Sequence, residues 1–418
     1  MAFLISAFLI LSSHAGWNTE AIYTAKTFQV GVDNLGFEDS YETSFWGSLK
    51  ARWFLAKSAK KKKIWVKEAF RNRIPVMYHV QQEKRWRHPK YDSRDRDVME
   101  SEAYYVDLKR PLIIYLPGIF NNAASSHSRR AYDRFEKLGY HFLALPNPWS
   151  KDYINANPYG AKPGDVLHEA VSLRKVMDKA IDLIGKENIT SIELVGASYG
   201  AFVAGVIQAF EDPNDPLFST TTIISPPMDF RYSIPYIDEQ MLSVSGKVEE
   251  NDIWDNIKLV FDYLLAGFRT DIDEENLEKA KPYTIQIGFK QALLKSIKEY
   301  AKVHDLDWIP HFDDEKEQAE WEDNFVFNYY FENHAPEILK VLQSEFASLH
   351  YWIDAAQASN FSPRIITADD DFLNPEFFPT KSMFENYPPA TYLSLPEGGH
   401  LGFLAFPWYE SFYSKVWN

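Results

Sequence analysis

The regular alternation of short apolar runs with helical patterns is the feature that most constrains how this chain of 418 residues can fold. Apolar runs typical of buried strands occur at 112–116, 142–145, 192–195 and 221–225, and helical patterns lie between them at 128–138, 173–184 and 201–210. Strands that alternate with helices pair in parallel through right-handed crossovers. The sequence therefore predicts an α/β fold, with a mostly parallel sheet flanked by helices.

A long acidic segment interrupts this alternation. Residues 227–360 have mostly helical periodicity and hold 27 Asp and Glu against 12 Lys and Arg. The patterns that return after it are two strands and a final helix, at 364–367, 391–394 and 408–417. We expect one core, formed by residues 111–226 and 361–418, that is interrupted by a helical cap insertion at 227–360.

Residues 16–110 precede this core and carry an excess of positive charge. From Lys50 to Arg110 the chain has 18 Lys and Arg against 8 Asp and Glu, including a run of lysines that starts at Lys60. We expect the segment to supply the first, antiparallel strands of the sheet, with 64–70 and 76–81 as candidates. Its charge is typical of a solvated face, and a peripheral contact with an anionic membrane surface near Lys60 is the alternative.

The first residues, 1–15, leave the cellular location open. Their apolar run at 2–11 is too short to span a bilayer, which takes about 20 residues, and Ser13-His14-Ala15 resembles a signal-peptidase site. A signal peptide usually begins with positive charge, but no Lys or Arg precedes the run. The alternative is therefore an apolar segment that packs on the domain. The protein is therefore expected to be either exported, as a periplasmic or secreted protein, or cytoplasmic.

The composition excludes several kinds of site. The absence of cysteine removes disulfides, iron–sulfur clusters, thiolate zinc sites and cysteine nucleophiles. A formal net charge of −15 disfavours a nucleic-acid partner, because phosphate binding needs a local excess of cations. The histidines and aspartates between His304 and Asp314 match no known spacing of metal ligands. We expect an acidic solvated loop there rather than a metal site.

The sharpest functional signal is Gly196-Ala197-Ser198-Tyr199-Gly200, which lies between a predicted strand and a predicted helix. This context is typical of a nucleophile elbow, a strained turn that lifts the serine hydroxyl above the sheet. Strand and helix approach closely at such a turn, so only small residues fit two positions on either side of Ser198. The N–H of Tyr199 would then point at the reacting oxygen. The alternative is a glycine-rich turn without a nucleophile.

A serine hydroxyl needs an adjacent base, and the base needs a carboxylate that orients it. His400 is the candidate base, because it lies in a glycine-rich loop just after the last predicted strand. The chain order Ser, Asp, His places the carboxylate between them, at the end of a strand. Asp369, Asp370 and Asp371 follow such a strand, and the residues alone do not distinguish among the three.

The oxyanion of such a reaction needs a second N–H, from the loop after the third strand. Residues 116–122, Leu-Pro-Gly-Ile-Phe-Asn-Asn, occupy that place. Gly118 would let the backbone approach the serine, and the N–H of Ile119 is the candidate partner of the Tyr199 N–H. The alternative is a plain strand-to-helix turn.

Together these pieces resemble the α/β-hydrolase superfamily, and in finer detail its YheT-like branch of abhydrolase-domain serine hydrolases. Residues 397–403, Glu-Gly-Gly-His-Leu-Gly-Phe, look like the Gly-Gly-His-x-Gly-Phe histidine loop of that branch, and 368–371 look like its Ala-x-Asp-Asp-Pro segment. The resemblance implies that Asp371 is the catalytic acid, with Asp370 as the alternative. Pro117 and Phe372 stand where the branch has histidine and proline.

What the resemblance implies is hydrolysis of small-molecule carboxylic esters, of the lipid or acyl class, without a metal or cofactor. Ser198 would attack the carbonyl, His400 would accept and return the proton, and Asp371 would hold the imidazole. The same residues suit an amidase or peptidase, or an acyltransferase. A non-catalytic binding module is a further alternative, because a fold does not determine a function.

By its position in the chain, the insertion is expected to fold over Ser198 as a cap. It is rich in aromatic residues, among them Trp308, Phe327 and Tyr330. Some of these residues are expected to line an apolar acyl pocket. The alternative is that most of them pack as the core of the cap itself.

Overall fold

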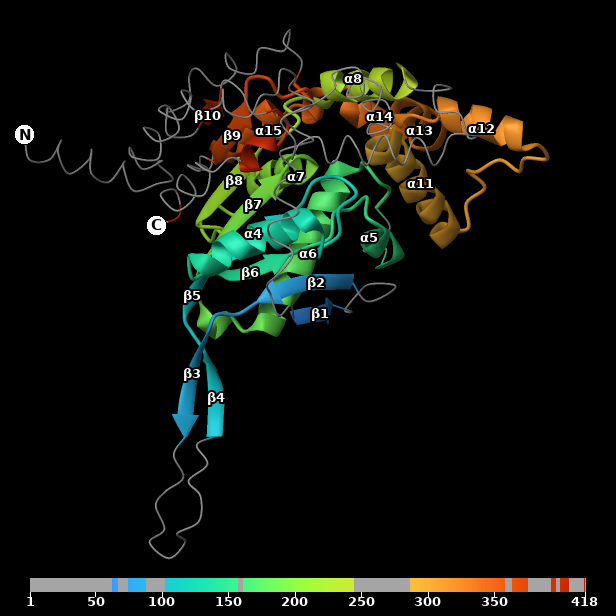
Figure 1. Ribbon diagram of the computed structural model, residues 1–418. Helices are drawn as coiled ribbons and strands as arrows, with labels where there is room; N and C mark the ends of the chain where they lie inside the picture. Colours follow the sequence, from blue (N-terminus) through green and yellow to red (C-terminus); the bar gives the residue numbers. More distant parts are fainter. Residues whose placement is uncertain are drawn as a thin grey trace, which may run out of the picture.

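The computed structural model describes residues 62–66, 74–87, 102–156, 161–243, 286–357, 363–374, 392–395, 399–405 and 417. They form an eight-stranded sheet, helices on both of its faces, and a separate two-stranded hairpin (Figure 1). The expectations about residues 1–15 and Lys60 fall outside these ranges, as does nearly all of the helix expected at 408–417. Within these ranges, no helix combines the length and the apolar character that crossing a bilayer requires.

The strands of the large sheet lie in the order β1-β2-β6-β5-β7-β8-β9-β10. Their bounds are β1 Lys62–Val66, β2 Ile74–His79, β5 Arg110–Leu116, β6 His141–Ala144, β7 Ile189–Ala197, β8 Thr220–Ile224, β9 Arg364–Ala368 and β10 Tyr392–Leu395. β2 is antiparallel to both of its neighbours, and the other neighbouring pairs are parallel. The prediction of a mostly parallel α/β sheet is confirmed, and the strand order and directions are those of the α/β-hydrolase fold.

The helices form two groups. Those that flank the sheet early in the chain are α4 Ser126–Lys137, α5 Lys151–Ala156, α6 Val166–Ile184 and α7 Tyr199–Ala209. The short helix η3 Lys186–Asn188 follows α6. The later helices are α8 Phe230–Ser243, α11 Gln291–His304, α12 Glu315–Asn324, α13 Phe327–His334, α14 Pro336–Leu342 and α15 Leu349–Gln357, with the short helices η5 Gln286–Lys290, η6 Glu345–Ala347 and η7 Gly402–Ala405. α8 and α11 to α14 gather at one end of the molecule (Figure 1), whereas α15 packs against α7.

Two elements differ from the expectations for physical reasons. α6 begins seven residues before the expected 173, because Asp165 caps its N-terminus by accepting a hydrogen bond from the His168 N–H. The hairpin of β3 Gln82–Arg87 and β4 Glu102–Asp107 was not expected. Its strands pair only with each other and project away from the sheet (Figure 1). The sequence of β3 is polar and so has no buried-strand pattern.

The central strand β5 shows how the sheet is buried on both faces. Leu112, Ile114 and Leu116 pack into the core that includes α6 and α7, whereas Ile113 and Tyr115 pack on the other face, with α4. All five are buried. Successive side chains of a strand point to opposite faces, so a strand covered on both sides requires the continuous apolar run that the sequence shows.

The backbone is packed very closely where β7 turns into α7. A Cβ atom added to Gly196 would lie 2.4 Å from the backbone oxygen of Gly200. One added to Gly200 would lie 2.4 Å from the oxygen of Leu116 and 2.5 Å from that of Pro117. Because these neighbours are backbone atoms, which cannot turn aside, the expectation that only very small residues fit here is confirmed.

We predict that Gly200→Ala lowers the free energy of unfolding by about 1–3 kcal/mol or more, because the new methyl group overpacks the turn. Gly288→Ala is the matched control, since a Cβ there meets nothing within 4 Å. Urea unfolding followed by circular dichroism measures both. Equal stability of the two variants would contradict the close approach.

Candidate active site

Ser198 occupies the turn between β7 and α7 in a strained backbone conformation. Its φ is 54° and its ψ is −128°, a region that residues other than glycine rarely adopt. The backbone N–H of Ser198 donates to the carbonyl oxygen of Ile224 at 2.9 Å, and the backbone carbonyl oxygen of Ser198 accepts from the N–H of Ala201 at 2.8 Å. Such strain persists only where the surroundings hold it, and here the neighbouring strand and the first turn of α7 do so.

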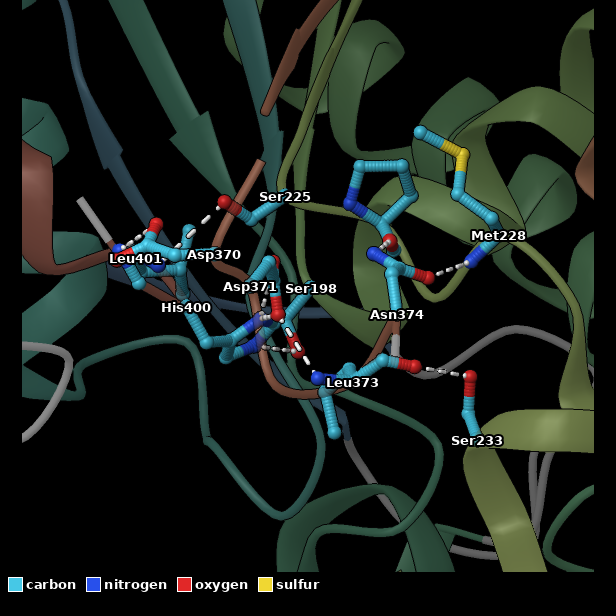
Figure 2. A network of polar contacts seen from close by, with 12 residues as sticks. Ser198, Ser225, Met228, Ser233, Asp370, Asp371, Leu373, Asn374, His400 and Leu401 are labelled. Atoms are coloured by element: carbon cyan, nitrogen blue, oxygen red, sulfur yellow. Dashed lines mark hydrogen bonds and ion pairs between the residues drawn. The ribbon is translucent and has the colours of Figure 1, made fainter. Parts of the chain in front are cut away.

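His400 lies between Ser198 and Asp371 (Figure 2). Its Nε2 atom is 2.8 Å from Ser198 Oγ, and its Nδ1 atom is 3.1 Å and 3.0 Å from the two carboxylate oxygens of Asp371. The Asp371 side chain is fully buried, and that of His400 is 11% exposed. A carboxylate at Nδ1 keeps the proton on that nitrogen, so the Nε2 lone pair faces the serine hydroxyl. The structure thus brings together the three side chains selected from the sequence.

The other two acids of the 369–371 run have different partners. Asp370 Oδ1 accepts a hydrogen bond from the N–H of Gly399 at 2.7 Å. Asp369 accepts one from the hydroxyl of Ser394 in β10. Asp371 is therefore the acid that contacts the imidazole, and Asp370 anchors the loop that carries the histidine.

The turn that carries Asp371 is tied to the insertion by contacts that the sequence did not reveal (Figure 2). The Leu373 N–H donates to Asp371 Oδ1 at 3.0 Å, and the Ser233 hydroxyl of α8 donates to the Leu373 oxygen at 2.7 Å. Asn374 Oδ1 accepts from the N–H of Met228 at 2.8 Å. Ser233 and Leu373 are 140 residues apart and Met228 and Asn374 are 146 apart, and no local pattern in the chain points to such contacts.

The loop after β5 lies directly against the serine. A Cβ atom on Gly118 would lie 3.1 Å from Ser198 Cβ, so glycine allows the close approach. Ile119 and Tyr199 both line the cavity that contains Ser198. Tyr199 is the first residue of α7, and an N–H at that position has no acceptor within its helix.

Two asparagines that the sequence analysis did not consider hold this loop. Asn121 Nδ2 donates to the oxygen of Ile119 at 3.0 Å, and Asn147 Nδ2 donates to the oxygen of Pro117 at 3.1 Å. Asn147 is buried. By donating to the carbonyl groups of residues 117 and 119, the two side chains fix the conformation of the loop beside Ser198.

An apolar cavity lies beside Ser198, and the empty space at this site, including its opening to solvent, is about 570 Å³. Much of its wall comes from the insertion, through Phe230, Ile237, Phe289, Phe327, Phe331 and Leu342. Other aromatic residues of the insertion pack among themselves, as Trp308 does against Tyr300, with ring centroids 5.4 Å apart. Some aromatic residues of the insertion therefore line the cavity and others form the core of the insertion itself, so both alternatives considered from the sequence apply.

A buried carboxyl group that the sequence analysis missed lies beside Tyr199. Glu169 is fully buried; its Oε2 accepts from the Tyr199 hydroxyl at 2.6 Å, and its Oε1 accepts from the Gly164 N–H at 2.8 Å. Burial raises the pKa of Glu169 to about 8. The sequence does contain a signal for this buried carboxyl. Val166, Glu169 and Leu173 follow the three- and four-residue spacing of one helix face, so Glu169 lies on an otherwise apolar face of the helix.

The histidines and aspartates at 304–314 form no common site. His304 stacks on Tyr300, with centroids 4.2 Å apart, whereas His311 is 92% exposed and lies 3.6 Å from Asp313. In the part of the chain that the structure describes, no group of three or more His, Asp or Glu side chains is arranged to hold a metal ion.

No protein-family model and no curated protein sequence matches this chain. Among solved structures, it is similar to a hyperthermophilic esterase from the archaeon Pyrobaculum calidifontis, with 13% identity, a TM-score of 0.43, and coverage of 96% of this chain and 97% of that chain. An esterase from Pyrococcus furiosus matches with 13% identity, a TM-score of 0.42, and coverage of 86% and 89%. The strand order and the turn at Ser198 define the fold of this chain.

We predict a strongly downfield proton resonance from His400 Nδ1–H, because a charged acceptor deshields the proton that it binds. Asp371→Asn should shift the resonance upfield or abolish it. Asp370→Asn, the matched control, should leave it in place, since an amide oxygen can still accept from the Gly399 N–H. Proton NMR in water makes the measurement, and the opposite pattern would assign the contact to Asp370.

Proposed function

We propose that this protein is a serine hydrolase that cleaves carboxylic esters with an apolar acyl group. The observation that carries the proposal is the hydrogen-bonded chain Ser198–His400–Asp371 at the edge of an apolar cavity. A serine hydroxyl in contact with an imidazole that a carboxylate orients is an activated nucleophile.

The geometry supports a two-step reaction. Ser198 Oγ attacks the ester carbonyl while His400 Nε2 takes the hydroxyl proton, and Asp371 stabilises the imidazolium. The N–H groups of Ile119 and Tyr199 bind the oxyanion, and each such donor is worth about 3 kcal/mol. His400 then protonates the leaving alkoxide, which departs as the alcohol. In the second step His400 activates a water molecule, which releases the acid and restores the serine.

Within the α/β-hydrolases, we propose the YheT-like branch as the nearest family, on the basis of its histidine loop. In that loop Leu401 has a positive φ of 64° and donates to the Ser225 hydroxyl at 3.4 Å, and Phe403 is fully buried. Phe372, which replaces the proline of the branch, lies edge-on to the His400 ring at 5.5 Å. The replacement therefore gives the imidazole an aromatic neighbour.

We predict that a fluorophosphonate probe labels the wild-type protein covalently at Ser198. Ser198→Ala should abolish the labelling, and His400→Ala should slow it by about 10⁴-fold or more, because the hydroxyl then lacks its base. His311→Ala, at an exposed histidine, should label at the wild-type rate. Mass spectrometry of the labelled peptide locates the adduct. A wild type that the probe leaves unlabelled would instead support a non-catalytic binding module.

We predict that kcat/KM for p-nitrophenyl esters rises from acetate to octanoate by about fourfold per methylene, because each buried methylene contributes about 0.8 kcal/mol. Ile237→Phe partly fills the cavity, so it should lower kcat/KM for the octanoate ester but not for the acetate ester. Leu242→Phe, at an exposed position of the same helix, is the control. A preference of the wild type for acetate would exclude an apolar acyl site.

A further inference from the structure

We propose that Glu169 is a positioning residue of this active site: it holds Tyr199, and through it the N–H that binds the oxyanion. The inference rests on the proposed hydrolase function. It assigns a role to a buried carboxyl that the Ser–His–Asp chain does not use, and it makes the oxyanion site depend on a residue 30 positions away from Tyr199.

Tyr199 is held at both of its ends. Its backbone follows directly on Ser198, whose left-handed conformation is strained. Its ring packs edge-on against Trp149, with centroids 6.4 Å apart, and lies 5.8 Å from that of Phe230. Its hydroxyl donates to Glu169 at 2.6 Å. Because the tip and the backbone are both fixed, the side chain supports the strained turn and the direction of the Tyr199 N–H.

The second oxygen of Glu169 joins this support to the wall of the cavity. It accepts from the N–H of Gly164, a residue with φ +92° where an added Cβ would lie 2.8 Å from Phe331. The preceding residue, Pro163, accepts a hydrogen bond from the Tyr330 hydroxyl of α13 at 3.0 Å. Glu169 therefore connects Tyr199 to a loop that the insertion holds in place.

The surroundings of Glu169 favour its uncharged form. The titratable groups that face it are Tyr199 of α7, Tyr330 of α13, and Asp165 before its own helix, and none of these is a cation. Its pKa is raised to about 8 by burial, so the carboxyl keeps its proton at pH 7. At higher pH a negative charge forms beside the residue whose N–H binds the oxyanion, and this charge opposes the reaction.

The test compares Glu169→Leu and Glu169→Gln in the full-length protein with p-nitrophenyl octanoate. Glu169→Leu removes the acceptor of the Tyr199 hydroxyl and should lower kcat about tenfold with KM unchanged. Glu169→Gln keeps an uncharged acceptor for the Tyr199 hydroxyl in its amide oxygen, loses only the acceptor for the Gly164 N–H, and should retain most of the wild-type kcat at pH 7. The wild-type kcat should fall above about pH 8 through the Glu169 titration, and Glu169→Gln should lack that fall. Glu211→Gln, a buried carboxyl paired with Arg174 outside the cavity, should keep the wild-type kcat and pH profile.

Fluorophosphonate labelling separates failure of this inference from failure of the proposed function. If the wild type is not labelled at Ser198, the hydrolase function itself fails. If it is labelled and Glu169→Leu keeps the wild-type kcat, Glu169 does not position Tyr199. Should Glu169→Leu fail to fold, the pH profile of Glu169→Gln decides: loss of the alkaline fall supports the inference, and a profile identical to that of the wild type overturns it.

Discussion

The left-handed backbone of Ser198 is the constraint on which the rest of the site depends. A turn this tight brings β7, α7 and the loop after β5 within van der Waals contact of one another, so Gly196 and Gly200 have no room for a side chain and Gly118 has little. The same turn raises the hydroxyl above the sheet and leaves the N–H of the next residue outside the helical hydrogen bonds. The strain and the chemistry are thus two consequences of one local geometry.

The insertion and the catalytic machinery share their supports. The turn of Asp371 is hydrogen-bonded through Leu373 to Ser233 of α8, and α8 also forms part of the cavity wall. On the other side of the site, Tyr199 contacts Glu169, which binds the loop held by α13. A movement of the insertion would therefore change the acid, the oxyanion site and the acyl cavity together.

The sequence predicted the elements whose signals are local. Apolar runs located the central strands, and the glycines around Ser198 together with the loop of His400 located the reactive groups. The choice of Asp371 over Asp370 depended on a resemblance to a family motif. Neighbouring aspartates at the end of a strand differ only in the direction in which their side chains point, and the sequence does not show that direction. The start of α6 differed by seven residues from the prediction, because the cap at Asp165 determines it.

What the sequence could not predict depends on distant partners. Asn374 contacts Met228 across 146 positions of the chain, and the cavity walls are assembled from several helices of the insertion. Glu169 has the spacing of a core residue but the chemistry of a surface one, and its contacts with Tyr199 and Gly164 explain its place. Each of these contacts follows from tertiary packing, which no periodicity in a single segment encodes.

A crystal structure of the protein with an alkyl boronic acid bound tests most directly whether Ser198 is the nucleophile and whether the loop after β5 and the start of α7 supply the oxyanion donors. We predict a covalent bond from boron to Ser198 Oγ, with one boronate oxygen about 2.7–3.1 Å from the N–H groups of both Ile119 and Tyr199, and the alkyl chain in the apolar cavity. A boronate attached elsewhere, or one whose oxygens face away from both N–H groups, would contradict it.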